Sequence, residues 1–184
     1  GTEPHTGEYA VSQTVRLYWA DPYRTRFQAA VVETLEHAGR PAVVLDATCF
    51  YPTSGGQPCD TGSLHNVRVV EVLEQGEDIV HLLAEPLDTV QAHDRLCGAI
   101  DWERRYDHMQ QHTGQHLLSQ AFLRELGAAT LSFHLGEEAC TIDVQLASLD
   151  WEQAARVEEA ANSIVWANQP VTTREYSPDE AVEE

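Results

Sequence analysis

The hydrophobic positions of this chain change their period once, close to residue 103. Before that point, short segments rich in valine, leucine and isoleucine alternate with polar residues or run without interruption, and Gly, Pro, Asp or Asn punctuate the gaps. Such segments are typical of β-strands. We predict strands over residues 15–20, 27–37, 41–47, 67–74, 79–84 and 95–102. Six short strands with hairpin-sized connections favour a small barrel.

From residue 103 onwards the pattern is that of helices and strands in alternation. A long helix is predicted over residues 103–126, with Gly127 as its C-cap, followed by strands over 130–135 and 140–146. Asp150 is a plausible N-cap for a second helix that reaches residue 168, and a strand over 170–176 and a helix from Ser177 complete the chain. The predicted fold class is α+β, with a small β-barrel domain over residues 9–102 and an α+β domain with a long histidine-bearing helix over residues 103–184.

Three histidines stand four residues apart on this long helix: His108, His112 and His116. Residues at this spacing lie on one face of an α-helix, and two imidazoles at i and i+4 can bind one metal ion. The residues between the second and third histidine are Thr-Gly-Gln, so the glutamate that serves zinc proteases as a general base is absent. For the pair His112 and His116 alone, metal ligation and coincidence remain equally open. His108 is interpreted as a structural histidine rather than a third ligand.

Four segments carry more information together than the histidines do alone. They read DWERRYDHMQQHTGQHLLSQAF (101–122), FYPTSGGQPCDTG (50–62), SFHLG (132–136) and NSIVWANQPV (162–171). In this set and order they resemble the motifs of the alanyl-tRNA editing family, which comprises the editing domain of alanyl-tRNA synthetase and the freestanding AlaX proteins. The resemblance extends over about residues 9–184.

The resemblance implies a function, a partner and a cofactor. We expect a trans-editing hydrolase that deacylates tRNA(Ala) wrongly charged with serine or glycine. A zinc ion bound by His112 and His116 would activate water for attack on the ester. The N-terminal barrel would help to bind the acceptor end of the tRNA. The alternative is a catalytically incomplete tRNA-binding or accessory module, and a third hypothesis is an unrelated metalloprotein with two histidine ligands.

One family motif has no counterpart in this chain. The resemblance implies further zinc ligands from a downstream Cys-x-x-x-His motif, but the residues four positions after Cys49, Cys59, Cys97 and Cys140 are Thr53, Ser63, Asp101 and Val144. We therefore expect that a further C-terminal segment, a partner or a second copy of the chain completes the site, or that the metal has been lost. Enzymatic activity and full zinc occupancy depend on which of these applies.

The glycine-rich segment contains Gly55, Gly56 and Gln57, a triplet that resembles the Gly-Gly-Gln loop with which peptide release factors reach an ester on tRNA. Glycines here also predict a tight turn, because they adopt positive φ without strain. The family resemblance implies that this loop lies near the editing cleft, with the two glycines binding substrate and Gln57 acting in catalysis. Thr53 and Ser54 are weaker candidates.

Three further residues complete the predicted site. His134 alternates with Phe133 and Leu135 in a predicted strand, so it faces away from them, towards either solvent or the cleft; we place it with Gln57 as a catalytic residue. Thr113 points about 100° away from the neighbouring imidazole and is therefore not expected to be a metal ligand, and we place it among the substrate-binding residues. The third residue is Arg104, which we also predict to contact the substrate.

Charge limits the kind of RNA binding that this chain can support. Thirty acidic residues against eleven basic residues, all arginine, give a formal net charge of −19. A generic nucleic-acid-binding protein instead carries a basic surface. We expect weak RNA binding through a few arginines, namely Arg16, Arg24, Arg26, Arg104 and Arg105. The favoured explanation of the acidity is a solubility or salt-tolerance trait of the organism.

The remaining composition indicates a globular protein in a reducing compartment. No apolar run approaches the ~20 residues of a membrane span, and residues 1–8 lack the features of a signal peptide. The four cysteines are scattered and form no Cys-x-x-Cys pair, which favours free thiols and a cytoplasmic location.

Overall fold

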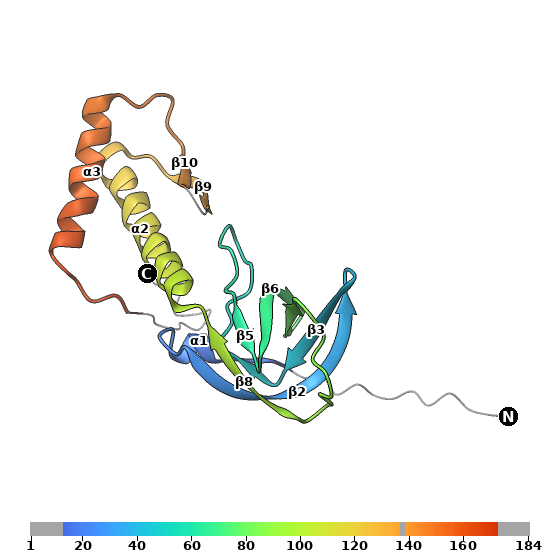
Figure 1. The fold of residues 1–184 in the computed structure, drawn as a ribbon. Helices are drawn as coiled ribbons and strands as arrows, with labels where there is room; N and C mark the ends of the chain where they lie inside the picture. Colours follow the sequence, from blue (N-terminus) through green and yellow to red (C-terminus); the bar gives the residue numbers. More distant parts are fainter. Residues whose placement is uncertain (1–12, 137–138, 173–184) are drawn as a thin grey trace, which may run out of the picture. The chain divides into compact units, whose positions relative to one another are not determined.

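The structure is a computed structural model and describes residues 13–136 and 139–172 (Figure 1). It contains helices and mainly antiparallel strands, so the predicted α+β class is confirmed. The described residues form two compact units. The first contains the residues up to Thr113 together with Phe133–Thr141, and the second contains Gly114–Ser132 and the residues from Ile142 onwards. The predicted domain boundary at residue 103 coincides with the start of a helix, whereas the compact units divide within that helix.

Six strands of the first unit pair in a closed ring (Figure 1). Every pairing in the ring is antiparallel, and the order is β2-β3-β7-β6-β5-β8. The strands are β2 (Arg26–His37), β3 (Arg40–Leu45), β5 (Gly62–Leu64), β6 (Val67–Gln75), β7 (Asp78–Leu83) and β8 (Arg95–Ile100). Five of them agree with predicted strands to within two residues. Sequence reasoning missed β5, because three residues that include glycine and serine carry no hydrophobic alternation.

The first predicted strand, over residues 15–20, is wrong. Only β1 (Val15–Arg16) is extended, pairing in parallel with β4 (Ala47–Thr48), and a single helical turn, α1 (Leu17–Ala20), follows it. The helical turn places the buried ring of Tyr18 against Tyr51, with 5.0 Å between ring centroids, and leaves Trp19 exposed. Tertiary packing of Tyr18 therefore overrides the local preference for a strand.

Alternate residues of the barrel strands face opposite sides of the sheet. One set, including Val31, Leu45 and Ile79, forms the principal core around Phe50. The opposite set, including Val44 and Leu82, forms a smaller apolar cluster. Register shifts in β2 and β6 interrupt the alternation, and such bulges increase strand curvature. Both faces of β3 and β7 are buried because one apolar cluster lies on each face, which explains their uninterrupted hydrophobic runs.

The second unit consists of the C-terminal part of α2 (Trp102–Leu126), parts of the two-stranded sheet β9 (Thr130–Leu135) and β10 (Cys140–Val144), and α3 (Trp151–Trp166). Gly127 ends α2 with a φ of +65°, and its N–H donates to the carbonyl of Leu123. Asp150 forms a capping box with Gln153, as predicted from its position.

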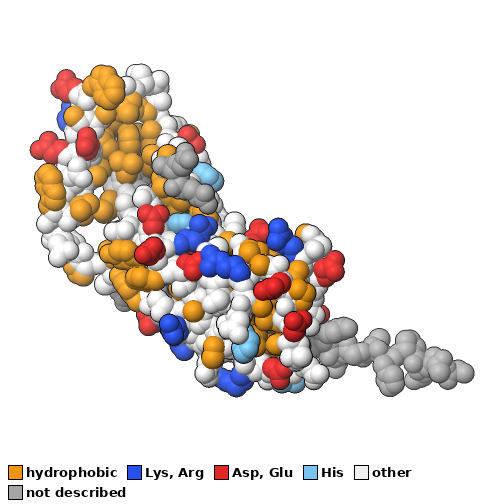
Figure 2. All heavy atoms as spheres, viewed as in Figure 1, with side chains coloured by type: hydrophobic (Ala, Val, Ile, Leu, Met, Phe, Trp, Pro, Cys, Tyr) orange, Lys and Arg blue, Asp and Glu red, His pale blue; other side chains and the backbone are white. Residues whose placement is uncertain are grey.

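Phe122 and Val157 are buried in the core of the second unit, and both aromatic ends of α3, Trp151 and Trp166, are exposed. Figure 2 shows hydrophobic side chains gathered over the α2 and α3 part of this unit. Residues 170–172 form no strand, and the rest of the strand predicted over 170–176, like the helix predicted from Ser177, lies outside the described residues. No helix in the described part of the chain combines the length and hydrophobicity that crossing a membrane requires.

Candidate functional site

The predicted glycine turn is the tip of a β-hairpin between β4 and β5. Ser54 and Gln57 form an antiparallel bridge through two backbone hydrogen bonds of 3.1 and 2.8 Å. Gly55 and Gly56 lie between them with φ of +50° and +87°. Positive φ at both central residues is the requirement of a two-residue type I′ turn, so the predicted need for glycine is confirmed. The side chain of Gln57 is half-buried beside this turn.

The base of the hairpin is attached to the first turn of α2 by a buried ion pair. Arg105 and Asp60 are 3% and 2% exposed, and both guanidinium Nε and Nη2 donate to the carboxylate. The same guanidinium donates to the carbonyls of Cys49 (2.6 Å) and Pro22 (2.8 Å). Asp60 in turn accepts from the backbone N–H of Tyr51 at 2.7 Å, closing the hairpin. These hydrogen bonds hold the base of the hairpin in a fixed position.

Arg104, a predicted substrate contact, also binds the hairpin. Its Nε donates to the carbonyl of Cys59 at 2.9 Å, and its side chain is half-buried. Two consecutive arginines of α2 thus bind backbone carbonyls of the segment that carries the Gly-Gly-Gln turn. The contact between Arg104 and substrate stays a prediction.

The tip of the hairpin meets strand β9, and β9 meets the histidine helix. The carbonyl of Gly56 accepts the backbone N–H of Leu135 at 2.9 Å. A Cβ atom added to Gly56 would lie 2.6 Å from the carbonyl oxygen of Phe133. The ring of Phe133 stacks on the imidazole of His112, with 6.0 Å between centroids and 21° between planes. Three motifs that are distant in the sequence therefore converge within the first unit.

His112 and His116 are one turn apart on α2, as predicted, and this spacing suits two ligands of one zinc ion. His112 is half-buried and His116 is exposed. Within residues 13–136 and 139–172, no group of three or more His, Cys, Asp or Glu residues is placed to bind a metal. The two imidazoles fit part of a zinc site, and the described residues do not complete the set of three protein ligands that catalytic zinc sites have.

His108, the first of the three helix histidines, is 6% exposed, and its Nδ1 atom has no hydrogen-bond partner. Burial is the main reason why the pKa of His108 is lowered, and the charge of Arg104 contributes in the same direction. His108 is thus a buried side chain whose surroundings disfavour the protonated form, and its interpretation as a structural histidine stays a prediction.

The other predicted site residues lie close to these contacts. His134 is exposed on β9, directly after Phe133, and its Cα would be 3.7 Å from a Cβ on Gly56. Thr113 is half-buried on α2, next to His112. Backbone proximity therefore places His134 beside the glycine turn, while the catalytic and substrate-binding roles of these side chains stay predictions.

Of the arginines predicted to bind RNA, three contact other elements of the fold, and one of them is Arg104, which donates to the carbonyl of Cys59 as described above. Arg105 is buried in the ion pair described above and is not accessible to RNA, so this prediction is wrong for Arg105. Arg16 contacts Glu74 at 2.6 Å and lies over the ring of Trp19, 4.9 Å from its centroid. Arg24 and Arg26, in contrast, are exposed. Sequence alone does not distinguish a buried arginine from an exposed neighbour when both stand in one charged helical segment.

Phe133 is the residue at this site whose role sequence reasoning missed. Its ring contacts His112 and its carbonyl borders Gly56. In the sequence it reads as an ordinary core position of a strand. The available signal was its place in the family-like segment SFHLG, but only the tertiary structure shows which helix its ring contacts.

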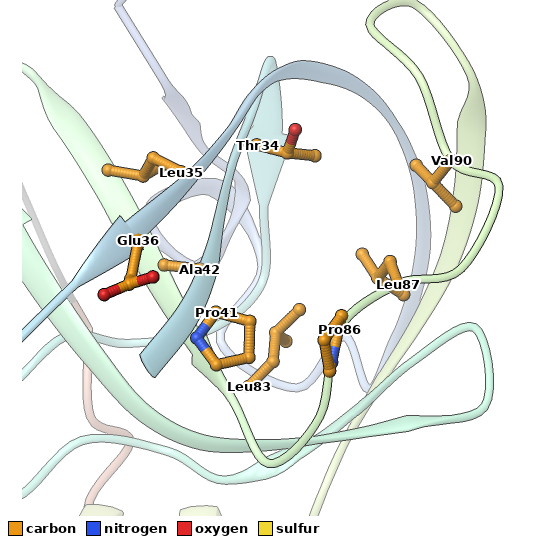
Figure 3. Close-up of a pocket in the computed structure, with 9 residues that line it drawn as sticks. All are labelled: Thr34, Leu35, Glu36, Pro41, Ala42, Leu83, Pro86, Leu87 and Val90. Atoms are coloured by element: carbon orange, nitrogen blue, oxygen red, sulfur yellow. The ribbon is translucent and has the colours of Figure 1, made fainter. Parts of the chain in front are cut away.

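A surface depression on the barrel contains none of the predicted site residues (Figure 3). Figure 3 shows mainly aliphatic side chains around it, with Leu87 and Val90 on one side and Glu36 on the other. The lining residues are Thr34, Leu35, Glu36, Pro41, Ala42, Leu83, Pro86, Leu87 and Val90. Glu36 is the sole ionisable side chain among them, so the depression lacks the paired groups that acid–base catalysis requires.

The two glycines of the turn are expected to differ in their response to alanine. Gly55→Ala adds a Cβ atom in open space, so only the positive φ opposes it, at a cost of about 1 kcal/mol. Gly56→Ala adds the same backbone strain and drives Cβ into the carbonyl of Phe133, so we expect a loss of about 2–3 kcal/mol. Urea unfolding of both variants measures the difference.

Amide hydrogen exchange shows which hydrogen bonds these substitutions weaken. The amide of Leu135 donates to Gly56, so its protection should fall in Gly56→Ala and remain in Gly55→Ala. Equal stabilities and equal protection for the two variants would contradict the close approach of the turn to β9.

Comparisons with known proteins match most of the chain. A family described as tRNA synthetases class II (A) matches residues 20–104. Alanyl-tRNA editing protein AlaX-M of Methanosarcina acetivorans is 37% identical over 178 residues, which cover 91% of this chain and 71% of that protein. AlaX-L of Pyrococcus horikoshii is 32% identical over 88% of this chain and 41% of its own length. Aarsd1 of Rattus norvegicus, also named an alanyl-tRNA editing protein, is 37% identical over 75% of this chain and 33% of its own length.

Proposed function

Because this chain belongs to the AlaX-type alanyl-tRNA editing family, we propose that it deacylates mischarged tRNA(Ala) in trans. The observation that carries the proposal is the convergence of the Gly-Gly-Gln turn, β9 and the histidine helix through Gly56, Phe133 and His112. An ester hydrolase needs a group that activates water close to a segment that positions the substrate. In this proposal the glycine turn positions the substrate, and His112, which lies in the same compact unit as the turn, helps to hold the group that activates water.

The substrate in this proposal is tRNA(Ala) charged with serine or glycine, and its acceptor end lies against the glycine turn. Gln57 is a hydrogen-bonding residue for the substrate ester or the terminal ribose, and exposed His134 borders the same turn. Thr113, one residue after His112, faces the substrate from the helix. Stacking on Phe133 restricts the imidazole of His112 to one orientation, which reduces the entropy lost when the site binds its ligand.

Zinc is part of the proposal as the group that His112 and His116 would bind. A zinc ion lowers the pKa of bound water and so supplies a nucleophile at neutral pH. Further ligands would come from outside the described residues. If none is supplied, the alternative function is a tRNA-binding accessory module, which is favoured by the lack of a third metal-ligating side chain among the described residues.

Deacylation assays with Ser-tRNA(Ala), Gly-tRNA(Ala) and Ala-tRNA(Ala) test the function. With the ligands that complete the zinc site supplied, we expect hydrolysis of the first two, loss of hydrolysis on chelation, and loss in His112→Ala and His116→Ala with unchanged circular dichroism; without those ligands we expect little or no hydrolysis. Gln57→Ala should weaken hydrolysis and leave stability nearly unchanged. Gln120→Ala, exposed on the same helix, is the matched control and should hydrolyse as the wild type does.

Each other outcome has a defined meaning. Chelator-resistant hydrolysis that survives His112→Ala would remove zinc and the histidines from the proposal. Binding of tRNA(Ala) without hydrolysis would establish the accessory module. Unfolding of Gln57→Ala would show that this side chain is structural.

A further inference from the structure

Three aromatic rings form a series at the surface of the first unit. Tyr23 lies in the loop after α1, and Trp102 and Tyr106 occupy the first turns of α2. The Tyr23 and Trp102 centroids are 5.6 Å apart, and the Trp102 and Tyr106 rings stack at 5.4 Å with 28° between their planes. Tyr23 is 62% exposed and Tyr106 is 43% exposed. Large aromatic surfaces left accessible in this way are typical of binding sites rather than of a core.

The loop that carries Tyr23 is fixed in place by three hydrogen bonds. Arg105 donates to the carbonyl of Pro22 at 2.8 Å, and the N–H of Ile100 donates to the carbonyl of Thr25 at 3.0 Å. The N–H of Tyr23 itself donates to the carboxylate of Asp21 at 3.0 Å. The rings are therefore held in position before a ligand arrives, which lowers the entropic cost of binding.

The charges around the rings distinguish this surface from the rest of the chain. Arg24 and Arg26 are exposed directly after Tyr23, whereas the whole chain carries −19. Exposed Asp21, Glu103 and Asp107 offset these two arginines and half-buried Arg104. The surface is close to neutral within a strongly acidic protein. Stacking can therefore supply most of the affinity for a polyanion, and the two arginines supply local phosphate contacts.

We propose that Tyr23, Trp102 and Tyr106 form a stacking platform for unpaired nucleotides of an RNA strand. Aromatic side chains bind single-stranded RNA by stacking on successive bases, and arginines beside them contact the backbone. The identification of the strand as the unpaired 3′ end of a tRNA rests on the proposed function. The platform itself follows from the rings, their exposure and the adjacent arginines.

The position of the platform on α2 agrees with this strand. Trp102, Tyr106 and Thr113 project from one face of the helix, because their spacings of four and seven residues return to nearly the same direction. Tyr106 and His112 are separated by about 9 Å along the helix axis and by about 120° around it. This distance corresponds to roughly two to three stacked nucleotides at about 3.4 Å each. A strand whose terminal ester lies near His112 can therefore reach the rings with the nucleotides that precede it.

Fluorescence anisotropy with two RNA probes tests the platform. The first probe is the acceptor-stem hairpin of tRNA(Ala) with its unpaired 3′ end, and the second is the same hairpin without the unpaired nucleotides. We expect Tyr106→Ala and Tyr23→Ala to bind the first probe about tenfold more weakly than the wild type. Tyr106→Phe should restore binding, because phenylalanine retains the ring. The second probe should bind the wild type and the variants equally weakly.

Trp151→Ala is the matched control, because Trp151 is 91% exposed on α3 and belongs to the second unit. It should bind both probes as the wild type does. Raising salt from about 50 to 200 mM should weaken binding less than tenfold, since two arginines provide few phosphate contacts. A much steeper salt dependence would assign the affinity to charge and overturn the stacking proposal.

The outcomes for the platform and for the proposed function are separable. Weaker binding by the tyrosine variants of a protein that hydrolyses no charged tRNA supports the platform and refutes the hydrolase. Hydrolysis with wild-type binding in Tyr23→Ala and Tyr106→Ala refutes the platform alone. Unchanged RNA binding together with lost self-association would assign the rings to a protein contact and also overturn the proposal.

Discussion

Replacing Arg105 with methionine is expected to lower the free energy of unfolding by about 3–5 kcal/mol. The substitution preserves most of the side-chain volume and removes every donor. It leaves the carboxylate of Asp60, which is 2% exposed, without its counter-charge, and the carbonyls of Cys49 and Pro22 without a donor. An unpaired buried charge is much more costly than the loss of a surface contact. Urea unfolding followed by circular dichroism measures the change.

The exposed pair formed by Arg68 and Asp101 provides the control. Their side chains are 51% and 38% exposed, and Arg68→Met should therefore cost less than about 1 kcal/mol. The double variant Arg105→Met with Asp60→Leu should recover much of the loss, because it removes both buried charges. Equal costs for Arg105→Met and Arg68→Met, or no recovery in the double variant, would contradict the structural role of the buried pair.

The stability of the barrel is expected to fall between pH 6.5 and pH 4 because of His81. This side chain is completely buried in the barrel, and burial lowers its pKa from 6.5 to about 4. Its Nδ1 lies 3.1 Å from the carbonyl of Val43, so Nδ1 carries the proton, and its Nε2 then accepts from the hydroxyl of Thr48 at 2.7 Å. The neutral ring therefore satisfies both of its nitrogen atoms inside the barrel.

The sign of the pH dependence follows from the lowered pKa. As the pH falls below 6.5, the unfolded chain binds a proton at His81 that the folded barrel does not bind, so the folded state loses stability relative to it. The full contribution is present above pH 6.5, and about 3 kcal/mol is lost by the time the pH reaches the folded pKa of about 4.

Comparison of variants isolates this contribution from the contributions of the other ionisable groups of the chain. The difference in free energy of unfolding between the wild type and His81→Gln should shrink by about 3 kcal/mol from pH 7 to pH 4. Thr48→Val should lower stability at every pH while retaining the pH-dependent fall, because burial rather than Thr48 is the main cause of the lowered pKa. A pH-independent difference for His81→Gln would show that folding does not lower the pKa of His81.

Local chemistry was sufficient to predict several elements of the chain. The histidine helix, its C-cap at Gly127 and the N-cap at Asp150 each depend on residues within one or two turns of one another. The positive φ of Gly55 and Gly56 is likewise required by a turn of two residues. Helix periodicity, capping and turn chemistry act over short sequence distances, so a single sequence contains the whole signal.

Other features depended on contacts between distant segments, and the sequence pattern was misleading or silent there. Tyr18 forms a helical turn instead of a strand because Tyr51 packs against it, and β5 exists because β6 and β8 pair with it on either side. The same reason applies to Arg105, whose burial follows from the position of Asp60 and not from any property of its neighbours in the sequence.

The sequence by itself determined the α+β class, the long helix with His112 and His116 one turn apart, the tight glycine turn and membership of the editing family. Only the tertiary structure decided that Phe133 stacks on His112 and borders Gly56, and that Tyr23 lies beside Trp102. The first group follows from hydrophobic periodicity and local backbone geometry, which depend on residues that are close together in the sequence. The second group follows from side-chain packing between segments that are far apart in the sequence. Which side chains pack together depends on the three-dimensional arrangement of the barrel and the helix.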